Sequence, residues 1–347
     1  MKLIQAFSSR SFLIFFLSFS ILIGSGYNTY LSYERFYNPD SETYMNIAKG
    51  NFADQSLIRK YRIIVPFLAN MAACPIGAVY YKIVTDKRET YDWPLLTGFF
   101  LINSIILAFA ALFIFKIMEW QGTGMLASMI GLGAFLAGGR WAGYDAGHPV
   151  TDSLTILSIT VMVYGILKQN NLLLAAGIIV GLLSKESCAL FFPMLILFST
   201  KKTRVTVLLS IGISFLLYFG LKYWIDSITA TSAQASLDEA IDTVNSIKVS
   251  LVKLFSIKGM ADIFSVYGFF SLVFITGLFF KKFRISIKKS FSRIFIVFAL
   301  IILGHMLLST ELARMFYLGS ALFVPFLAKC FEIHPLFEKT VIEKGTS

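Results

Sequence analysis

Long apolar stretches that alternate with short polar segments dominate the sequence. A helix of about 20 mainly apolar residues is long enough to cross a membrane. Stretches that reach or approach this length lie at residues 11–31, 95–117, 122–139, 152–168, 204–224, 263–280, 291–309 and 313–330. Two shorter stretches, 171–184 and 186–199, meet at the sequence LLSKES and predict a tight pair of helices. The pattern predicts an all-α, polytopic membrane bundle of about 10 transmembrane helices, with residues 1–347 as a single domain.

Basic residues lie in clusters between the apolar stretches, and these clusters predict an orientation. The N-terminus is basic, the segment 201–204 holds three basic residues, and the segment 281–293 holds six and no acid. Because Lys and Arg gather on the cytoplasmic side of membrane proteins, we expect both termini in the cytoplasm. The loops 32–94 and 225–262 then face outward, and the expected location is the plasma membrane, the inner membrane of a bacterium. The first apolar stretch lacks a small-residue cleavage site and is interpreted as a membrane helix rather than a signal peptide.

The segment 62–84 is apolar enough to span, but a crossing there would reverse every later loop and place the basic segment 281–293 outside. We therefore expect an interfacial or re-entrant helix that is broken near Pro75. The basic residues before it are expected to bind lipid headgroups; they are Arg59, Lys60 and Arg62. A second short helix, amphipathic and outside the membrane, is predicted at 229–248.

Composition supports the membrane class. The chain is 56% hydrophobic and 15% charged, whereas soluble domains contain about 25% charged residues. The net charge of +11 would suggest nucleic acid as a partner of a soluble protein, but here the excess lies in the short clusters and no nucleic-acid motif is present. The cysteines Cys74, Cys188 and Cys330 lie far apart in apolar surroundings, so buried thiols are expected rather than a metal site or a disulfide.

Unusual polar residues gather in the segments that are predicted to face outward. These are Asp40 and Glu42 in the first loop, Arg140, Asp145, His148 and Asp152 in the second, Lys185 and Glu186 between the short helices, and Glu311 and Arg314 in the last. Ionisable groups are costly at the mouth of a membrane bundle, so they are functional candidates. A carboxylate can accept a proton from an attacking hydroxyl, and Arg or Lys can hold a phosphate leaving group. This combination indicates transfer of a sugar from a lipid phosphate.

The candidate catalytic residues are Asp40, Glu42 and Asp145, with Asp40 as the leading base. The candidate residues for binding substrate and phosphate are Arg314, Lys185, Arg140, His148 and Asp152. The cofactor is left open: a divalent cation would have Asp40 and Glu42 as its ligands. Structural interpretations stand beside these roles, because Asp40 and Asp152 could each favour the start of a helix and Glu311 could form an ordinary helical ion pair with Arg314.

The layout resembles the GT-C superfamily of integral-membrane glycosyltransferases, which use polyprenyl-phosphate sugars. The first outer loop carries an acidic D-x-E element, here Asp40-Ser41-Glu42, and a bundle with short paired helices follows it. The segment GLLSKESCALFFP, 181–193, is similar to a helix-turn-helix of that superfamily, and Asp145 or Asp152 could match its later acid. The resemblance implies a mannosyltransferase-like, inverting transfer outside the cytoplasm. The partners would be a polyprenyl-phosphate-linked sugar, a glycan, lipid or protein acceptor, and membrane lipids, with no nucleic acid.

Two other functions remain open. A polysaccharide polymerase or ligase of the O-antigen or capsule type would use a diphosphate-linked glycan, an arginine-dominated site and a large outer loop such as 225–262. A transporter or flippase would place polar residues near the middle of the bilayer between pseudo-symmetric halves. The polar residues at one mouth and the lack of an internal repeat favour the transferase over the transporter.

Overall fold

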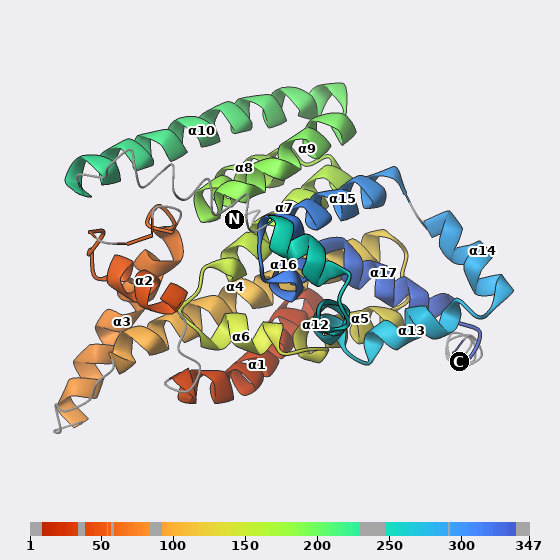
Figure 1. Ribbon diagram of the computed structural model, residues 1–347, viewed down its shortest axis with the longest axis horizontal. Coiled ribbons are helices and arrows are strands. Elements are labelled where there is room, and N and C mark those ends of the chain that lie inside the picture. The colour runs from red at the N-terminus through yellow and green to blue at the C-terminus, as the bar shows by residue number, and fades with distance from the viewer. Residues whose placement is uncertain are drawn as a thin grey trace.

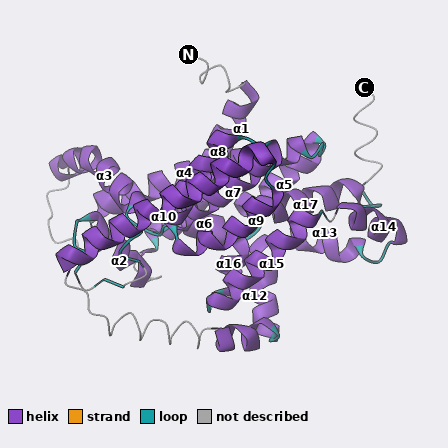
Figure 2. Cartoon of the chain, turned by 90° about the horizontal axis from the view of Figure 1, so that it is seen from above, coloured by secondary structure: helices purple, strands orange, loops and turns teal. Residues whose placement is uncertain are grey.

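The computed structural model describes residues 9–33, 39–53, 55–56, 59–83, 92–229, 247–290 and 292–337. Within these ranges the regular structure is helical and there is no strand, as Figure 2 shows. The prediction of an all-α chain is therefore confirmed for the described residues. The amphipathic helix predicted at 229–248 falls, apart from its ends, outside them.

Several helices are long and apolar enough to cross a membrane. In the described part of the chain these helices number 4, or up to 8 if each bent pair forms one span. The long ones are α1 (Ser9–Leu31), α3 (Ile64–Ile83), α4 (Trp93–Trp120) and α10 (Lys201–Thr229). The predicted total of about 10 crossings stays a prediction.

Four pairs of shorter helices are bent between their members. They are α5 (Met125–Ala137) with α6 (Trp141–Gly147) at 56°, α12 (Ile257–Tyr267) with α13 (Phe270–Gly277) at 110°, α14 (Lys281–Ser290) with α15 (Arg293–Leu308) at 91°, and α16 (Leu312–Leu318) with α17 (Ser320–Ile333) at 79°. The predictions of single helices over 263–280 and 313–330 were therefore wrong. Between α12 and α13, Gly268 adopts a φ of 51°, which a residue without a Cβ tolerates and which ends the first helix.

The remaining helices connect these elements. They are α2 (Pro39–Ala48), α7 (Asp152–Lys168), α8 (Asn171–Ser184), the 3-10 helix η3 (Glu186–Phe191) and α9 (Phe192–Phe198). The predicted tight pair at 171–184 and 186–199 is confirmed as α8 followed by η3 and α9. In Figure 1, α10 lies along one side of the molecule, and α2 and α3 lie together at one end.

The helix α4 forms the centre of the bundle, with most of its residues buried. It runs antiparallel to α1, because Thr97 bonds Tyr30 near the end of α1 while Glu119 pairs with Arg10 near its start. The end of the bundle with Thr97 also holds the start of α7 and is called the Asp152 end. The opposite end, with Glu119, is called the Arg10 end.

The helix α3 is continuous through Pro75, so the predicted break there was wrong. Proline in a helix removes only one backbone hydrogen bond, and here packing against α4 holds the helix together. The two helices run antiparallel and approach closely at Gly98, where an added Cβ would lie 2.2 Å from the carbonyl oxygen of Ala69. Cys74, predicted to be buried, is exposed on α3, whereas Cys188 and Cys330 are buried.

Large apolar side chains cover the outer faces of the long helices. On α10, Leu208, Leu209, Leu216 and Phe219 are each more than half exposed. Soluble monomers rarely show a contiguous apolar face of this kind, and a helix that crosses a membrane has one. Only 17% of the most apolar segment of α10 is buried inside the protein, which fits a helix at the edge of a membrane bundle.

We predict that Gly98→Ala destabilises the protein by about 1–3 kcal/mol, because the new methyl group forces α3 and α4 apart. The matched control is Gly212→Ala on α10, where an added Cβ meets nothing within 4 Å. That control should change stability by less than about 1 kcal/mol and in the stabilising direction. The measurement is the free energy of unfolding in micelles. Equal effects of the two substitutions would contradict the close approach.

Candidate functional site

A buried ion pair between Asp152 and Arg314 forms the centre of a polar network at the Asp152 end. Asp152, the first residue of α7, is 1% exposed, and Arg314 on α16 is 6% exposed. The Nε of Arg314 donates to Oδ2 of Asp152. Lys185, between α8 and η3, places its Nζ 3.3 Å from the other oxygen, Oδ1. Two cations from separate segments therefore neutralise one buried carboxylate.

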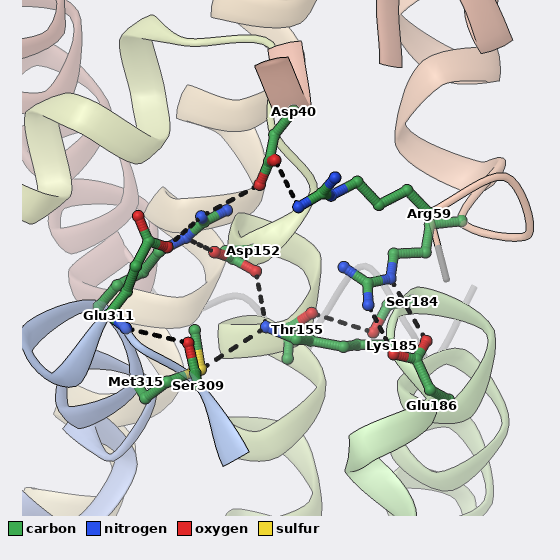
Figure 3. A network of polar contacts seen from close by, with 12 residues as sticks. Asp40, Arg59, Asp152, Thr155, Ser184, Lys185, Glu186, Ser309, Glu311 and Met315 are labelled. Carbon is green, nitrogen blue, oxygen red and sulfur yellow. Dashed lines mark hydrogen bonds and ion pairs between the residues drawn. The ribbon is translucent and has the colours of Figure 1, made fainter. Parts of the chain in front are cut away.

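The leading base candidate, Asp40, joins this network. Its Oδ2 accepts a hydrogen bond of 3.3 Å from Nη1 of Arg314, and its Oδ1 lies 2.7 Å from Nη2 of Arg59. The same Nη1 of Arg314 donates to Glu311 at 2.7 Å, the helical ion pair that the sequence suggested. Figure 3 shows Asp40, Arg59, Asp152, Lys185 and Glu311 pointing toward one another from different parts of the chain.

The basic residues before α3 bind protein carboxylates. The prediction that they contact lipid headgroups was wrong for the buried Lys60 and Arg62 and stays a prediction for the partly exposed Arg59. Their ion pairs are Arg59 with Asp40 at 2.7 Å, Lys60 with Asp226 at 2.7 Å and Arg62 with Glu186 at 2.6 Å. Arg62 also donates to the hydroxyl of the buried Tyr44 at 3.1 Å. These contacts join the segment after α2 to α10 and to η3. The sequence could not reveal these ion pairs, because the partners are 19 or more residues apart and meet only in the folded chain.

Asn103 on α4 holds the loop that leads into Asp152. Its Nδ2 donates to the carbonyl oxygens of His148 and Val150, at 3.0 and 3.1 Å, and its Oδ1 accepts from Ser153 at 2.5 Å. Asn103 is 0% exposed and lies in an apolar helix, where an amide needs such partners. Sequence reasoning missed this positioning residue. A lone amide within an apolar stretch was the available signal.

One face of α6 carries buried polar groups with no partner among the described residues. Trp141 and Asp145 are four residues apart and lie on the same side of α6, and His148 follows directly after the end of the helix. The indole Nε1, both carboxylate oxygens and both imidazole nitrogens lack a hydrogen-bond partner in the described part of the protein. Buried polar groups in native proteins are nearly always hydrogen-bonded. These three residues are called the α6 polar face, and the donors and acceptors on it are buried without a hydrogen bond to a described residue.

Asp145 differs from the other carboxylates of the site in having no cation on its oxygens. It is 1% exposed and lies within electrostatic reach of Arg314 and Lys185, which are both engaged by Asp152. The predicted grouping of Asp145 with the phosphate-binding candidates is therefore present in space. Its two oxygens are buried and accept no hydrogen bond from a described residue.

Two of the predicted site residues are exposed. Glu42 is exposed on α2. Residues two apart on a helix point about 200° apart, so Asp40 and Glu42 do not face each other. Arg140 is exposed at the start of α6 and stacks over the ring of Trp141 at 4.8 Å rather than facing the carboxylates. In the described residues no group of three His, Cys, Asp or Glu side chains is placed to hold a metal ion.

His148 lies beside the network, but it is not a fixed cation. Its ring is 0% exposed and contacts Tyr144 and Tyr33, with centroids 4.5 and 5.9 Å away. Burial, and secondarily the positive charge of Arg314, lower the pKa of His148 to about 4. The ring is neutral at pH 7 in this structure and can exchange hydrogen bonds with a ligand, and its role in binding substrate or phosphate stays a prediction.

Comparison with protein-family models, curated proteins and solved structures found no match to this chain. The likeness to the GT-C superfamily is therefore carried by the short motifs of the sequence and stays a prediction.

We predict that Asp152→Asn costs about 3–5 kcal/mol of stability, because it leaves Arg314 and Lys185 buried without their shared anion. The double variant Asp152→Asn/Arg314→Gln should lose less than the sum of the two single losses, because it removes the unpaired cation. The exposed pair Arg10 and Glu119, 2.9 Å apart, supplies the control, and Arg10→Gln should cost about 0–1 kcal/mol. Unfolding free energies in micelles give the comparison. Strict additivity at Asp152 and Arg314 would contradict the pairing.

Stability should fall on acidification through His148. Its pKa is lowered to about 4 in the folded chain, against an ordinary value of 6.5. The unfolded chain therefore binds the proton more tightly, and the folded state loses stability as the pH drops below 6.5. Between pH 7 and pH 5 this loss amounts to about 2 kcal/mol. It should be missing from His148→Gln when unfolding is measured at both pH values, and equal losses in the two proteins would refute the assignment.

Proposed function

We propose that this chain is an integral-membrane glycosyltransferase that moves a sugar from a polyprenyl-phosphate donor to an acceptor hydroxyl on the extracytoplasmic side. One observation carries the proposal. A carboxylate at the edge of a bundle, Asp40, shares Arg314 with a buried acid that also binds Lys185. These groups come from distant segments and meet at one end of apolar helices. A lipid-borne phosphate would present its reacting bond at that level.

The proposed reaction forms one bond and breaks one. The acceptor oxygen bonds to the anomeric carbon of the sugar while the bond from that carbon to the phosphate oxygen breaks. The electron pair leaves with the polyprenyl phosphate, and the proton of the acceptor hydroxyl passes to Asp40. Arg314 and Lys185 stabilise the charge that develops on the departing phosphate. No oxidant, reductant or further reactant is needed.

Arg314 links binding of the donor phosphate to the activation of the base, Asp40. In the resting structure its Nη1 is shared by Asp40 and Glu311, and Glu311 is 49% exposed in its side chain. An arriving phosphate competes for this nitrogen, because a guanidinium binds phosphate strongly in a forked geometry. Once Arg314 turns to the phosphate, Asp40 keeps its contact with Arg59 and can exchange the lost contact for one with the acceptor hydroxyl. Donor binding would thus prepare the base.

The α6 polar face supplies the second half of the site. Asp145 offers two acceptor oxygens, and His148 and Trp141 offer N–H donors, a set that matches the hydroxyl groups of a sugar or of an acceptor. Among the carboxylates predicted to orient the acceptor, this arrangement favours Asp145 over the exposed Glu42.

We predict that Asp40→Asn lowers transfer at least about 100-fold, because the amide cannot take the proton. Glu42→Gln on the same helix should lose far less. The measurement is release of the lipid carrier by purified protein in bilayers, with a panel of polyprenyl monophosphate and diphosphate sugars and a mixture of glycan and lipid acceptors. Thermal unfolding of both variants serves as the control for folding.

Release from a monophosphate donor that disappears in Asp40→Asn would support the transferase. Release from diphosphate donors alone, unchanged in Asp40→Asn, would replace it with the polymerase or ligase. Equal losses in the variants of Asp40 and Glu42 would refute the separate role given to Asp40.

A further inference from the structure

A cleft opens at the Arg10 end of the bundle, on the side away from the polar network. Two adjoining cavities of about 320 and 330 Å³ share Trp120, Leu167, Ser292 and Ile294 in their walls. These residues belong to the end of α4, the end of α7 and the start of α15. Leu167 and Asp152 lie at opposite ends of α7, so this cleft, called the α4–α15 cleft, is separate from the proposed reaction site.

The walls of the α4–α15 cleft are apolar and its rim is polar and basic. Leu167, Phe295, Leu322 and Phe326 supply apolar surface to the first cavity. The polar residues at its edge and in the second cavity are Gln121, Gln169, Ser292, Arg293 and Lys329, together with the indole of Trp120. A cleft with this division suits a molecule that has both an apolar chain and a polar head.

The charge around the cleft is positive. The acids of this end that the structure describes are already paired, Glu119 with Arg10 at 2.9 Å and Glu332 with Lys329 at 2.5 Å. Arg293 is exposed and forms no ion pair with a described residue. The head of a bound amphiphile would therefore meet a surplus of positive charge, which favours an anion.

The amphipathic helix α14 extends this basic rim. Its apolar residues Phe283 and Ile287 are 0% and 4% exposed and pack with Cys330 and Phe326 of α17. Phe326 also lines the cleft, so helix and cleft adjoin through one side chain. Basic residues cover the other face of α14 and are exposed; they are Lys281, Lys282, Arg284 and Lys288. Figure 1 shows α14 at one end of the molecule beside α17.

We propose that the α4–α15 cleft binds an anionic phospholipid, with an acyl chain against Leu167, Phe295 and Phe326. Its phosphate lies at Arg293, beside Lys329, which then shares its ammonium group between the phosphate and Glu332. The apolar helices place this cleft in contact with a bilayer, where such lipids are the abundant anionic amphiphiles. Basic pockets between membrane helices on the side rich in Lys and Arg hold acidic headgroups by this charge complementarity. The site is independent of the proposed transferase activity and lies at the other end of the molecule.

Trp120 in the wall makes the proposal directly measurable. Phosphatidylglycerol with brominated acyl chains quenches a tryptophan that its chains touch, and brominated phosphatidylcholine serves as the neutral comparison. In detergent micelles, we expect phosphatidylglycerol to quench at concentrations at least fivefold lower than phosphatidylcholine. The stronger quenching by phosphatidylglycerol than by phosphatidylcholine should be lost in Trp120→Phe. Equal quenching by the two lipids, or full quenching without Trp120, would overturn the site.

Two further variants separate a built site from diffuse charge. Arg293→Gln/Lys329→Gln should raise the half-saturating phosphatidylglycerol concentration at least fivefold. Lys201→Gln/Lys202→Gln removes the same charge from exposed residues at the same end, outside the cleft, and should change it less than twofold. Ile294→Trp keeps the charge but fills the cleft and should abolish the preference. Two outcomes would refute the proposal: equal effects of the two double variants, or a phosphatidylglycerol preference that survives Ile294→Trp. Either would show that anionic lipid is attracted only by the overall positive charge of this end. Size-exclusion chromatography of each variant serves as the control for folding.

Discussion

The need to compensate buried charge governs the Asp152 end of this protein. An ion taken from water into a helical bundle is strongly destabilising unless partners of opposite charge surround it. Asp152, at 1% exposure, meets this need with Arg314 and Lys185, which come from α16 and from the turn after α8. The requirement therefore fixes how three parts of the chain meet. The helix α16, which carries Arg314, departs by 79° from α17.

The same constraint links structure to the proposed chemistry. Arg314 holds Asp152 through Nε and reaches Asp40 and Glu311 through Nη1. The contact to Asp152 is buried, whereas those to Asp40 and Glu311 lie toward the edge of the bundle. A phosphate can compete for the outer contacts without exposing the inner charge pair. One arginine can thus remain structural at one nitrogen and exchange partners at another.

The sequence was sufficient to predict the helical class and the gathering of Asp40, Asp152, Lys185 and Arg314, because all four interrupt apolar patterns at segments expected on one side. It could not predict which cation meets which acid. Arg59, Lys60 and Arg62 matched headgroup anchors, since their partners, Asp40, Asp226 and Glu186, are identified only by the packing of α2, α10 and η3. Hydropathy likewise carries no information on the direction of a helix. The sharp bends between α12 and α13 and between α16 and α17 could therefore not be predicted from the mainly apolar stretches 263–280 and 313–330. The D-x-E motif did not reveal the orientation of its two acids, because helical geometry turns Glu42 away from Asp40.

Charges are balanced differently at the two ends of the bundle, and this difference underlies both the proposed reaction site and the proposed lipid site. At the Asp152 end, cations are matched by carboxylates, and the network is closed by side chains of the chain itself, apart from Asp145. At the Arg10 end, the described acids are paired while Arg293 and the outer face of α14 stay basic. An internally matched cluster is suited to a ligand that arrives, exchanges contacts and leaves. A basic surplus beside an apolar cleft requires a steady counter-charge, and in a bilayer the anionic lipid headgroups supply it. The first arrangement fits a substrate and the second a resident lipid.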